Sequence, residues 1–421
     1  MTDDRNRDRY IPFRKQDIVR MLLDEGRLGT EDERRDFNLF CKVLASIFHF
    51  EFHESLEKLK DSYYPLNPDL KKWGSFSPEE LESSSNELFK TLLDVLNHAN
   101  YDEISAEEIE RAQEASAALK VTIVVDMDDY ETVKLFYRGR RVETMEIKEL
   151  YGLRKRTIEE EVLERVVLMV RFKPKEYFDA KSGKSLPFEP DSTIIKLFKD
   201  VPRKDLEILF PNSRAVMATK DKLLLVVPAV AGGVPLLLTK VWPALLVTLV
   251  VVSAYLGIEG TVQENQLKQA IAAFSALAAL GGFCLKQWMK YKNKRYEFQK
   301  ELSDNLYFRN LVNNVGVFHS LIDAAEEEEC KEAFLAYYFL LTSDGALTEP
   351  ELDRLVESWF ETGNGCILDF ECDDALGKLQ RLNLLEKKPD GSLQVPGLEA
   401  ALARLDELWD GFFEFSKPEA C

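Results

Sequence analysis

The sequence is poor in the residues on which metal centres and disulfides depend. Its 421 residues include four histidines and six cysteines, and no two cysteines form a CxxC pair. One cysteine lies inside an apolar stretch, so we expect reduced thiols rather than a disulfide framework. The GxSxG motif of nucleophilic serine enzymes does not occur either. No cofactor is expected from these patterns.

Positive charge is also in deficit. The net charge is -19 and the isoelectric point is about 4.9. Proteins that bind nucleic acid place clustered lysine and arginine against the phosphates. Nucleic acid is therefore not expected as a partner.

Charge is scarce in residues 223–285, although the rest of the chain is rich in it. Two blocks in this region, 241–258 and 269–288, have the length of roughly 17 to 25 residues that a helix needs to cross a bilayer. The start, MTDDRNRDRYIPF, lacks the apolar core of a secretory signal and carries acids that mitochondrial presequences avoid. Insertion is therefore expected to use the internal blocks.

The apolar segment 223–240 is expected to be broken. Two prolines and two glycines interrupt it, and a single lysine separates it from the block that follows. Such a segment is typical of an interfacial or re-entrant piece, and the alternative is one long kinked span. The predicted fold class is a membrane protein with an α-helical two-span hairpin, cytoplasmic α and α+β parts, and a C-terminal winged-helix-like module.

The basic residues that follow the second block predict its orientation. They are Lys286, Lys290, Lys292, Lys294 and Arg295. Lysine and arginine near a span remain on the cytoplasmic side, where they can contact anionic lipid. Within the block, Ser275, Ala279 and Gly282 have the spacing of a helix-packing stripe. The predicted location is the bacterial inner (cytoplasmic) membrane with both termini cytoplasmic, or an organellar membrane if the source is eukaryotic.

The remaining sequence divides by pattern into further parts. Residues 192–210 are expected to be helical within an α+β part that begins with β-rich runs. The predicted boundaries are 1–118 (helical), 119–222 (α+β), 223–240 (broken apolar segment), 241–288 (hairpin), 289–325 (juxtamembrane basic helix) and 326–421 (winged-helix-like module).

The C-terminal part is expected to bind protein rather than DNA. A capping box at Thr348 and Glu351 predicts one helix, and a second helix is expected over 373–382, before a hairpin. That second helix opens with Asp369, Glu371, Asp373 and Asp374. These carboxylates would repel phosphates where a recognition helix approaches DNA.

Two other motifs bear on chemistry. His49 and His53 are four residues apart, and His53 with Glu54 begins the HExxH signature of zinc enzymes. Glu57 stands where the second histidine is required, so these residues are weak metal candidates and no metal is expected. The acidic run 326–329 is interpreted as a solvated helix start.

Four segments carry a family resemblance. They are RYIPFRKQDIV, VPAVAGGVPLLL, ELSDNLYFRNLVNNVGVFHSLIDAAEEEECKEAFLAYYFLL and DFECDDALGKLQRLNLL. The chain resembles an uncharacterised family that includes transmembrane protein 143. The resemblance implies an unknown function and, for eukaryotic members, an association with organelles, chiefly mitochondria. Some relatives carry an aminopeptidase label, which the incomplete HExxH does not support.

The functional prediction is an integral membrane protein that acts as a membrane-anchored cytoplasmic interaction or scaffolding protein. Its expected partners are the lipid bilayer and proteins that bind the cytoplasmic domains. The first alternative is a metal-dependent hydrolase. A transporter component is a second and weaker alternative. Bound metal or a cleft with converging titratable groups would favour an enzyme.

Overall fold

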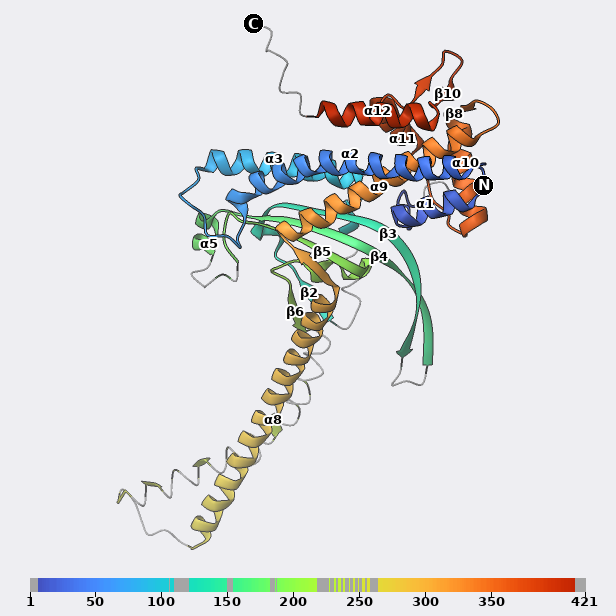
Figure 1. Cartoon of the computed structure of the whole chain (residues 1–421). Helices are drawn as coiled ribbons and strands as arrows, with labels where there is room; N and C mark the ends of the chain where they lie inside the picture. The colour runs from blue at the N-terminus through green and yellow to red at the C-terminus, as the bar shows by residue number, and fades with distance from the viewer. Residues whose placement is uncertain are drawn as a thin grey trace. The chain divides into compact units, whose positions relative to one another are not determined.

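The chain forms two compact units. The computed structural model describes residues 7–105, 107–109, 121–149, 154–181, 186, 188–217 and 264–412, with scattered positions between 227 and 257. The first unit comprises Met1–Ala106, Met127–Arg203 and Arg309–Cys421, and the second comprises Glu107–Asp126 and Lys204–Phe308. Figure 1 shows the ribbon of the chain.

The first unit contains an antiparallel sheet in the order β1-β3-β4-β5-β7. Its strands are β1 (Asp102–Glu103), β3 (Tyr130–Glu149), β4 (Arg154–Phe172), β5 (Thr193–Pro202) and β7 (Asn310–Asn313). The run from Val166 to Val170 in β4 is fully buried, as expected for a central strand covered on both faces.

The helix expected over 192–210 is wrong for residues 193–202, whereas Arg203–Leu209 form the 3-10 helix η5. Residues 193–202 form β5, which pairs with β4 on one side and β7 on the other. Alternation explains the strand, because Ile195 and Leu197 enter the hydrophobic core while Ile194 and Lys196 point to the opposite face.

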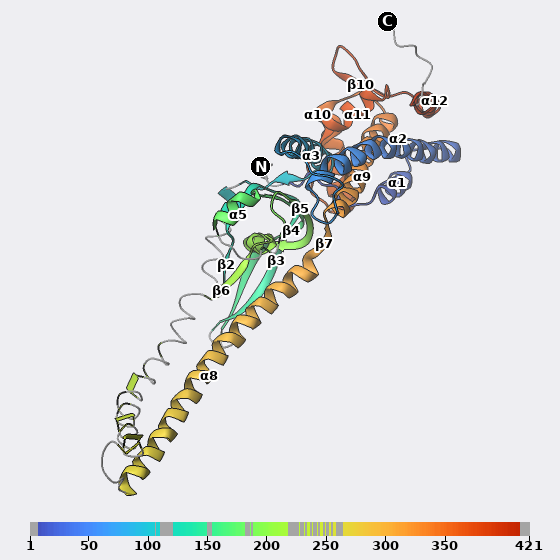
Figure 2. The ribbon, with the colours of Figure 1, turned by 90° about the vertical axis from the view of Figure 1, so that its left-hand side faces the viewer.

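Four helices pack their apolar side chains into one hydrophobic core with this sheet. They are α1 (Lys15–Asp24), α2 (Glu31–Tyr63), α3 (Pro78–His98) and α9 (Val315–Thr342). Figures 1 and 2 show α2, α3 and α9 over the same face of the sheet. Capping boxes at Thr30 and Ser77 begin α2 and α3, because they satisfy the first backbone N–H groups of each helix.

The C-terminal part adds a small sheet and three helices to the first unit. Its elements are β8 (Leu347–Thr348), α10 (Glu349–Asn364), α11 (Cys372–Arg381), β9 (Glu386–Lys387), β10 (Ser392–Gln394) and α12 (Leu398–Gly411). The strands pair in the order β8-β10-β9. The predicted capping box begins α10. Helix α11 packs on α9, so its inward face is unavailable to a partner.

The remaining elements are shorter, apart from one helix. They are α5 (Lys175–Lys181), η2 (Tyr64–Leu66), η3 (Met127–Asp129), η5 (Arg203–Leu209), β2 (Val121–Val124), β6 (Arg214–Met217) and α8 (Glu264–Arg309). In the second unit, β2 pairs antiparallel with β6.

The predicted transmembrane hairpin is wrong. Among the residues whose structure is described, no helix combines the length and the apolar character needed to cross a membrane. The block 269–288 lies inside α8, a 46-residue helix that continues through a lysine-rich second half to Arg309. The apolar block is therefore one part of a longer helix that also carries many charged residues. The segments 223–240 and 241–258 lie largely outside the described residues.

Candidate functional site

Helix α9 carries charged side chains into the interior of the first unit. The exposed fractions are 1% for Glu328, 3% for Glu329, 2% for Lys331 and 2% for Glu332. The interpretation of 326–329 as a solvated helix start is wrong, because α9 already begins at Val315. The acids lie in mid-helix, where neighbouring elements cover them on several sides. Burial of this kind requires partners for every charge.

One half of this buried charge cluster anchors the N-terminal segment. Lys331 Nζ lies 2.8 Å from Glu328 and donates to the Ile11 carbonyl at 2.7 Å, while Glu328 accepts from the Ile11 N–H at 3.3 Å. Arg138 of β3 lies 3.6 Å from the same carboxylate. Burial raises the pKa of Glu328 and lowers the pKa of Lys331. Ionised together, they neutralise each other.

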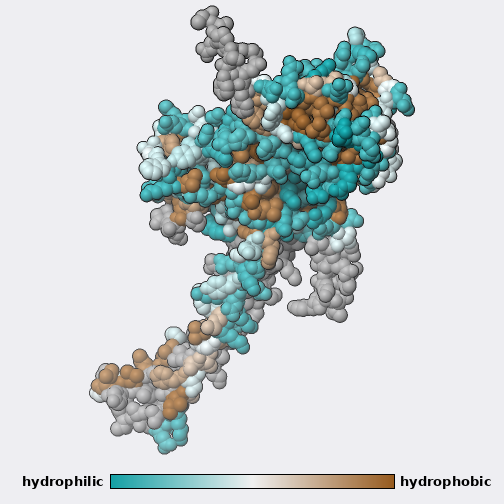
Figure 3. Space-filling view, viewed as in Figure 1, coloured by the Kyte–Doolittle hydropathy of each residue, from teal (hydrophilic) through white to brown (hydrophobic). Residues whose placement is uncertain are grey.

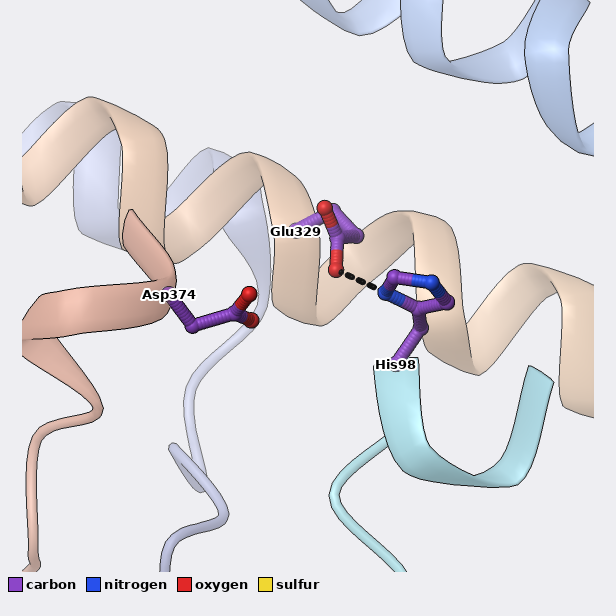
Figure 4. A group of neighbouring side chains, drawn as sticks. All are labelled: His98, Glu329 and Asp374. Atoms are coloured by element: carbon purple, nitrogen blue, oxygen red, sulfur yellow. Dashed lines mark hydrogen bonds and ion pairs between the residues drawn. The ribbon is translucent and has the colours of Figure 1, made fainter. Parts of the chain in front are cut away.

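The other half joins α3, α9 and α11. Lys378 Nζ of α11 lies 2.9 Å from Glu329 and 2.8 Å from Asp374, and it also donates to Glu332. His98 Nδ1 lies 2.7 Å from Glu329 Oε1, as Figure 4 shows. Burial raises the pKa of Glu332 to about 7. The hydrogen bond with Glu329 raises the pKa of His98.

This half contains the only three-ligand metal geometry in the described part of the chain. One ligand atom each from His98, Glu329 and Asp374 lies within 4.8 Å of the others. The Lys378 ammonium, however, is in contact with both carboxylates. A divalent cation between them would meet a buried positive charge at short range, which costs several kcal/mol at about 3 to 4 Å by Coulomb's law. The arrangement therefore suits a buried ion network better than a metal centre.

Beside this cluster, one face of α2 lines two hollows that meet at Ala45. The first, of about 280 Å³, is lined by Lys15, Gln16, Val19, Asn38, Cys41, Lys42, Ala45 and Phe334. The second, of about 550 Å³, is lined by Ala45, Ser46, His49, Phe50, His53, Glu326 and Trp409. We call the two together the α2 groove. Its α2 residues recur every three or four positions, which is the period of one helix face.

Glu326 of α9 connects the two hollows electrostatically. Its Oε1 accepts from Lys15 Nζ at 2.6 Å, and its Oε2 lies 2.8 Å from His49 Nδ1. The far end of the groove is aromatic, with ring centroids 4.7 Å apart for Phe50 and Phe412 and 6.3 Å apart for Phe50 and Trp409. Figure 3 shows apolar side chains gathered over α12 and the adjoining part of α2. The groove thus combines an apolar end with a charged middle.

The predicted metal candidates are only partly brought together. His49 and His53 line the same hollow, whereas Glu54 pairs with Lys58 at 2.9 Å and does not line it. The carboxylate beside His49 is Glu326, a residue 277 positions away. No local spacing rule could have found it, and the acidic run 326–329 was the one sequence signal. Within the described residues, these histidines do not form a three-ligand group.

The other predicted site residues lie on α8. Lys286, Lys290 and Lys292 are exposed, and the side chains of Lys294 and Arg295 lie outside the described part. Lipid contact by these residues stays a prediction. The predicted packing stripe of Ser275, Ala279 and Gly282 is also exposed along α8. Its role in helix packing stays a prediction as well.

One family model matches part of the chain. Residues 163–316 match the model of a protein of unknown function (DUF3754). No solved structure matches the chain. The matched segment runs from β4 through α8 to the first turn of α9. The walls that α1, α2 and α12 contribute to the α2 groove lie outside it.

Proposed function

We propose that the first unit is a protein-binding module that holds a helical segment of a partner in the α2 groove. The observation that carries the proposal is the continuous helix face from Asn38 to His53, open along two adjoining hollows. Grooves between helices bind amphipathic helices through apolar anchors. Phe50, Phe412 and the 42% exposed Trp409 supply aromatic surface of the kind that dominates protein interfaces.

Charge indicates which helices would bind. Lys42, His49 and His53 are exposed along the groove of a protein whose net charge is -19. Opposite charges across an interface speed association and select the partner. The expected occupant is an amphipathic helix with apolar residues at i, i+3 or i+4 and i+7, flanked by carboxylates.

The C-terminal helices support a protein partner over nucleic acid. Lys378 of α11 is buried among carboxylates, and Arg381 is bonded to Glu51 at 2.5 Å. Lys378 is therefore engaged inside the protein, and the half-exposed Arg381 is paired at the surface. Asp374, at the start of α11, has a half-exposed side chain that would repel phosphate.

The DUF3754 match supports a further proposal, that the chain belongs with the family that includes transmembrane protein 143. The match covers residues 163–316 and carries no activity. An interaction role requires no catalytic activity, because binding in a groove depends on complementary shape and charge.

Selection of peptides from a displayed helix library on the full chain tests the groove. We expect the selected peptides to be acidic and amphipathic. Ala45→Arg fills the junction of the two hollows and should lower the affinity for these peptides at least about tenfold, or about 1.4 kcal/mol. Ala403→Arg is the matched control, because Ala403 is exposed on α12 and does not line the groove. Peptides that are basic, or that bind both variants equally, would disprove the proposal.

A further inference from the structure

A separate hollow lies on the face of β5 that points away from the helices. Its volume is about 560 Å³. Its walls are Pro68, Asp69, Leu186, Phe188, Glu189, Ile194, Lys196, Asn313 and Asn314. All of these residues belong to the first unit, and those from 186 onward fall in the segment that matches DUF3754. The volume lies within the range of small-molecule sites, about 300 to 1,000 Å³.

Lys196 is the unusual group in this hollow. Strand alternation directs it to the same face as Ile194, and it stands opposite Leu168 of β4 and Asn313 of β7. Its ammonium forms no ion pair and no hydrogen bond with the residues that the structure describes. Burial lowers the pKa of Lys196. Surface lysines are ordinarily solvated or paired, so a half-buried lysine without a carboxylate calls for an explanation.

One carboxylate of this hollow, that of Asp69, is engaged by another side chain. Asp69 Oδ2 accepts from Asn314 Nδ2 at 2.6 Å. Asn314 is in turn held by β5, since its N–H donates to the Ile195 carbonyl at 2.7 Å and its Oδ1 accepts from the Ile195 N–H at 3.1 Å. These bonds keep Asp69 engaged and leave the Lys196 amine unpaired.

The same bonds maintain backbone strain beside the lysine. Asn314 has φ 51° and ψ -125°, outside the left-handed helical region that asparagine commonly visits. Such a conformation costs on the order of 1 to 3 kcal/mol and persists where the surroundings over-determine it. Strain of this kind gathers at functional sites, and here it gives the hollow a fixed wall.

We propose that Lys196 is the nucleophile of a small-molecule site that captures an aldehyde or a ketone as an imine. A lysine desolvated in an apolar pocket has a larger neutral fraction, and the neutral amine is the nucleophile. Leu186, Phe188 and Ile194 form apolar walls for the body of the ligand. The ligand class is therefore a carbonyl compound with an apolar or aromatic group.

The reaction balances with the groups at hand. The Lys196 Nζ lone pair attacks the carbonyl carbon, and the carbonyl oxygen takes a proton to give a carbinolamine. Loss of that oxygen, with the two protons that the amine supplies, releases water and leaves the carbon–nitrogen double bond. Glu189 lines the hollow and provides a carboxylate for the proton transfers.

Competition between lysines in one sample tests the proposal. The full chain is treated with benzaldehyde and cyanoborohydride over a pH series, and peptide mapping compares Lys196 with the exposed Lys90 of α3. Near neutral pH we expect Lys196 to be alkylated several-fold faster, because burial lowers its pKa and so enlarges its neutral fraction. Equal rates, or rates that rise with pH in the same way, would overturn the proposal.

Two variants and one competitor locate the reaction. Lys196→Arg should keep the charge and the melting temperature and abolish the adduct at this position. Ile194→Trp should fill the hollow and slow labelling of Lys196, whereas labelling of Lys90 should be unchanged. Unchanged labelling at Lys196 would remove the hollow from the mechanism. Inorganic phosphate is the competitor. If phosphate protected Lys196 from labelling, and the labelling rate did not saturate with benzaldehyde concentration, the hollow would be an anion site and imine capture would be refuted. None of these results depends on the α2 groove.

Discussion

At the scale of single residues, the first unit is defined by where it places charge. Lys378 and Lys196 are both removed from bulk water, yet their surroundings differ. Burial opposes the charge on Lys378, but Glu332, Glu329 and Asp374 outweigh it and raise its pKa. Among the residues that the structure describes, Lys196 has no such partner, and burial lowers its pKa. One lysine is thereby structural and the other is available for chemistry.

Replacement of Lys378 tests the structural role. Lys378→Met leaves the carboxylates of Glu329 and Glu332 buried without their cation, and loss of one partner from a buried pair costs about 3 to 5 kcal/mol. Urea denaturation should show that loss of unfolding free energy. Lys387→Met is the control, because its pair with Glu349 is half-exposed and exposed pairs contribute about 1 kcal/mol or less. A similar, small loss of unfolding free energy in both variants would contradict the structural role of Lys378.

At the scale of elements, helices that begin at a local capping signal could be predicted from the sequence. Strands that depend on pairing with distant segments could not. The capping boxes at Thr30, Ser77 and Thr348 each begin a helix, because a cap involves residues only three positions apart. The β-rich run at 193–202 was misread as helix, since its strand conformation depends on pairing with β4 and with the distant β7. Pairing between distant segments leaves little trace in a short window of sequence.

Helix α8 offers a prediction of its own. If its exposed Lys286, Lys290 and Lys292 contact anionic lipid, their replacement by Gln should weaken binding of the full chain to phosphatidylserine vesicles. At about 1 kcal/mol for each lysine, the partition coefficient should fall on the order of a hundredfold. Gln at the exposed Lys42, Lys58 and Lys71 is the matched control. Equal vesicle binding by both triple variants would remove α8 as a lipid-contacting surface.

At the scale of the whole molecule, α9 assembles chain segments that are far apart in sequence. The N-terminal segment joins it through Ile11, α2 through His49, α3 through His98 and α11 through Lys378. The extreme N-terminal segment also pairs with the C-terminal part, where Asp8 forms a bridge with Leu368. Because ionised groups mediate most of these junctions, the stability of the first unit should depend on pH.

The expected direction of that dependence follows from two raised pKa values. Glu332 has a pKa of about 7 in the folded state against an ordinary 4.5, and the pKa of His98 is also raised. A raised folded-state pKa gives stability that is complete below the unfolded value and is lost as pH rises through the folded value. The free energy of unfolding should therefore fall between about pH 5 and pH 8.

Glu332→Gln isolates one contribution. In this variant the free energy of unfolding should depend less steeply on pH. For a pKa shift of this size, the free energies of unfolding of the variant and the parent protein can differ by about 3 kcal/mol. Urea denaturation at several pH values measures both proteins under the same conditions. A slope unchanged in Glu332→Gln would show that this carboxyl does not titrate as inferred.

The sequence by itself determined the features that depend on near neighbours. Helix starts, the shared face of His49 and His53, and the acidic opening of α11 follow from spacings of a few residues. Tertiary structure alone decided that Glu326 meets His49, that Glu329 and Glu332 contact Lys378, and that Lys196 and Asn314 line one hollow. The physical reason is that burial and pairing of charge are set by segments up to hundreds of residues away, whereas a sequence window records only which charges are present.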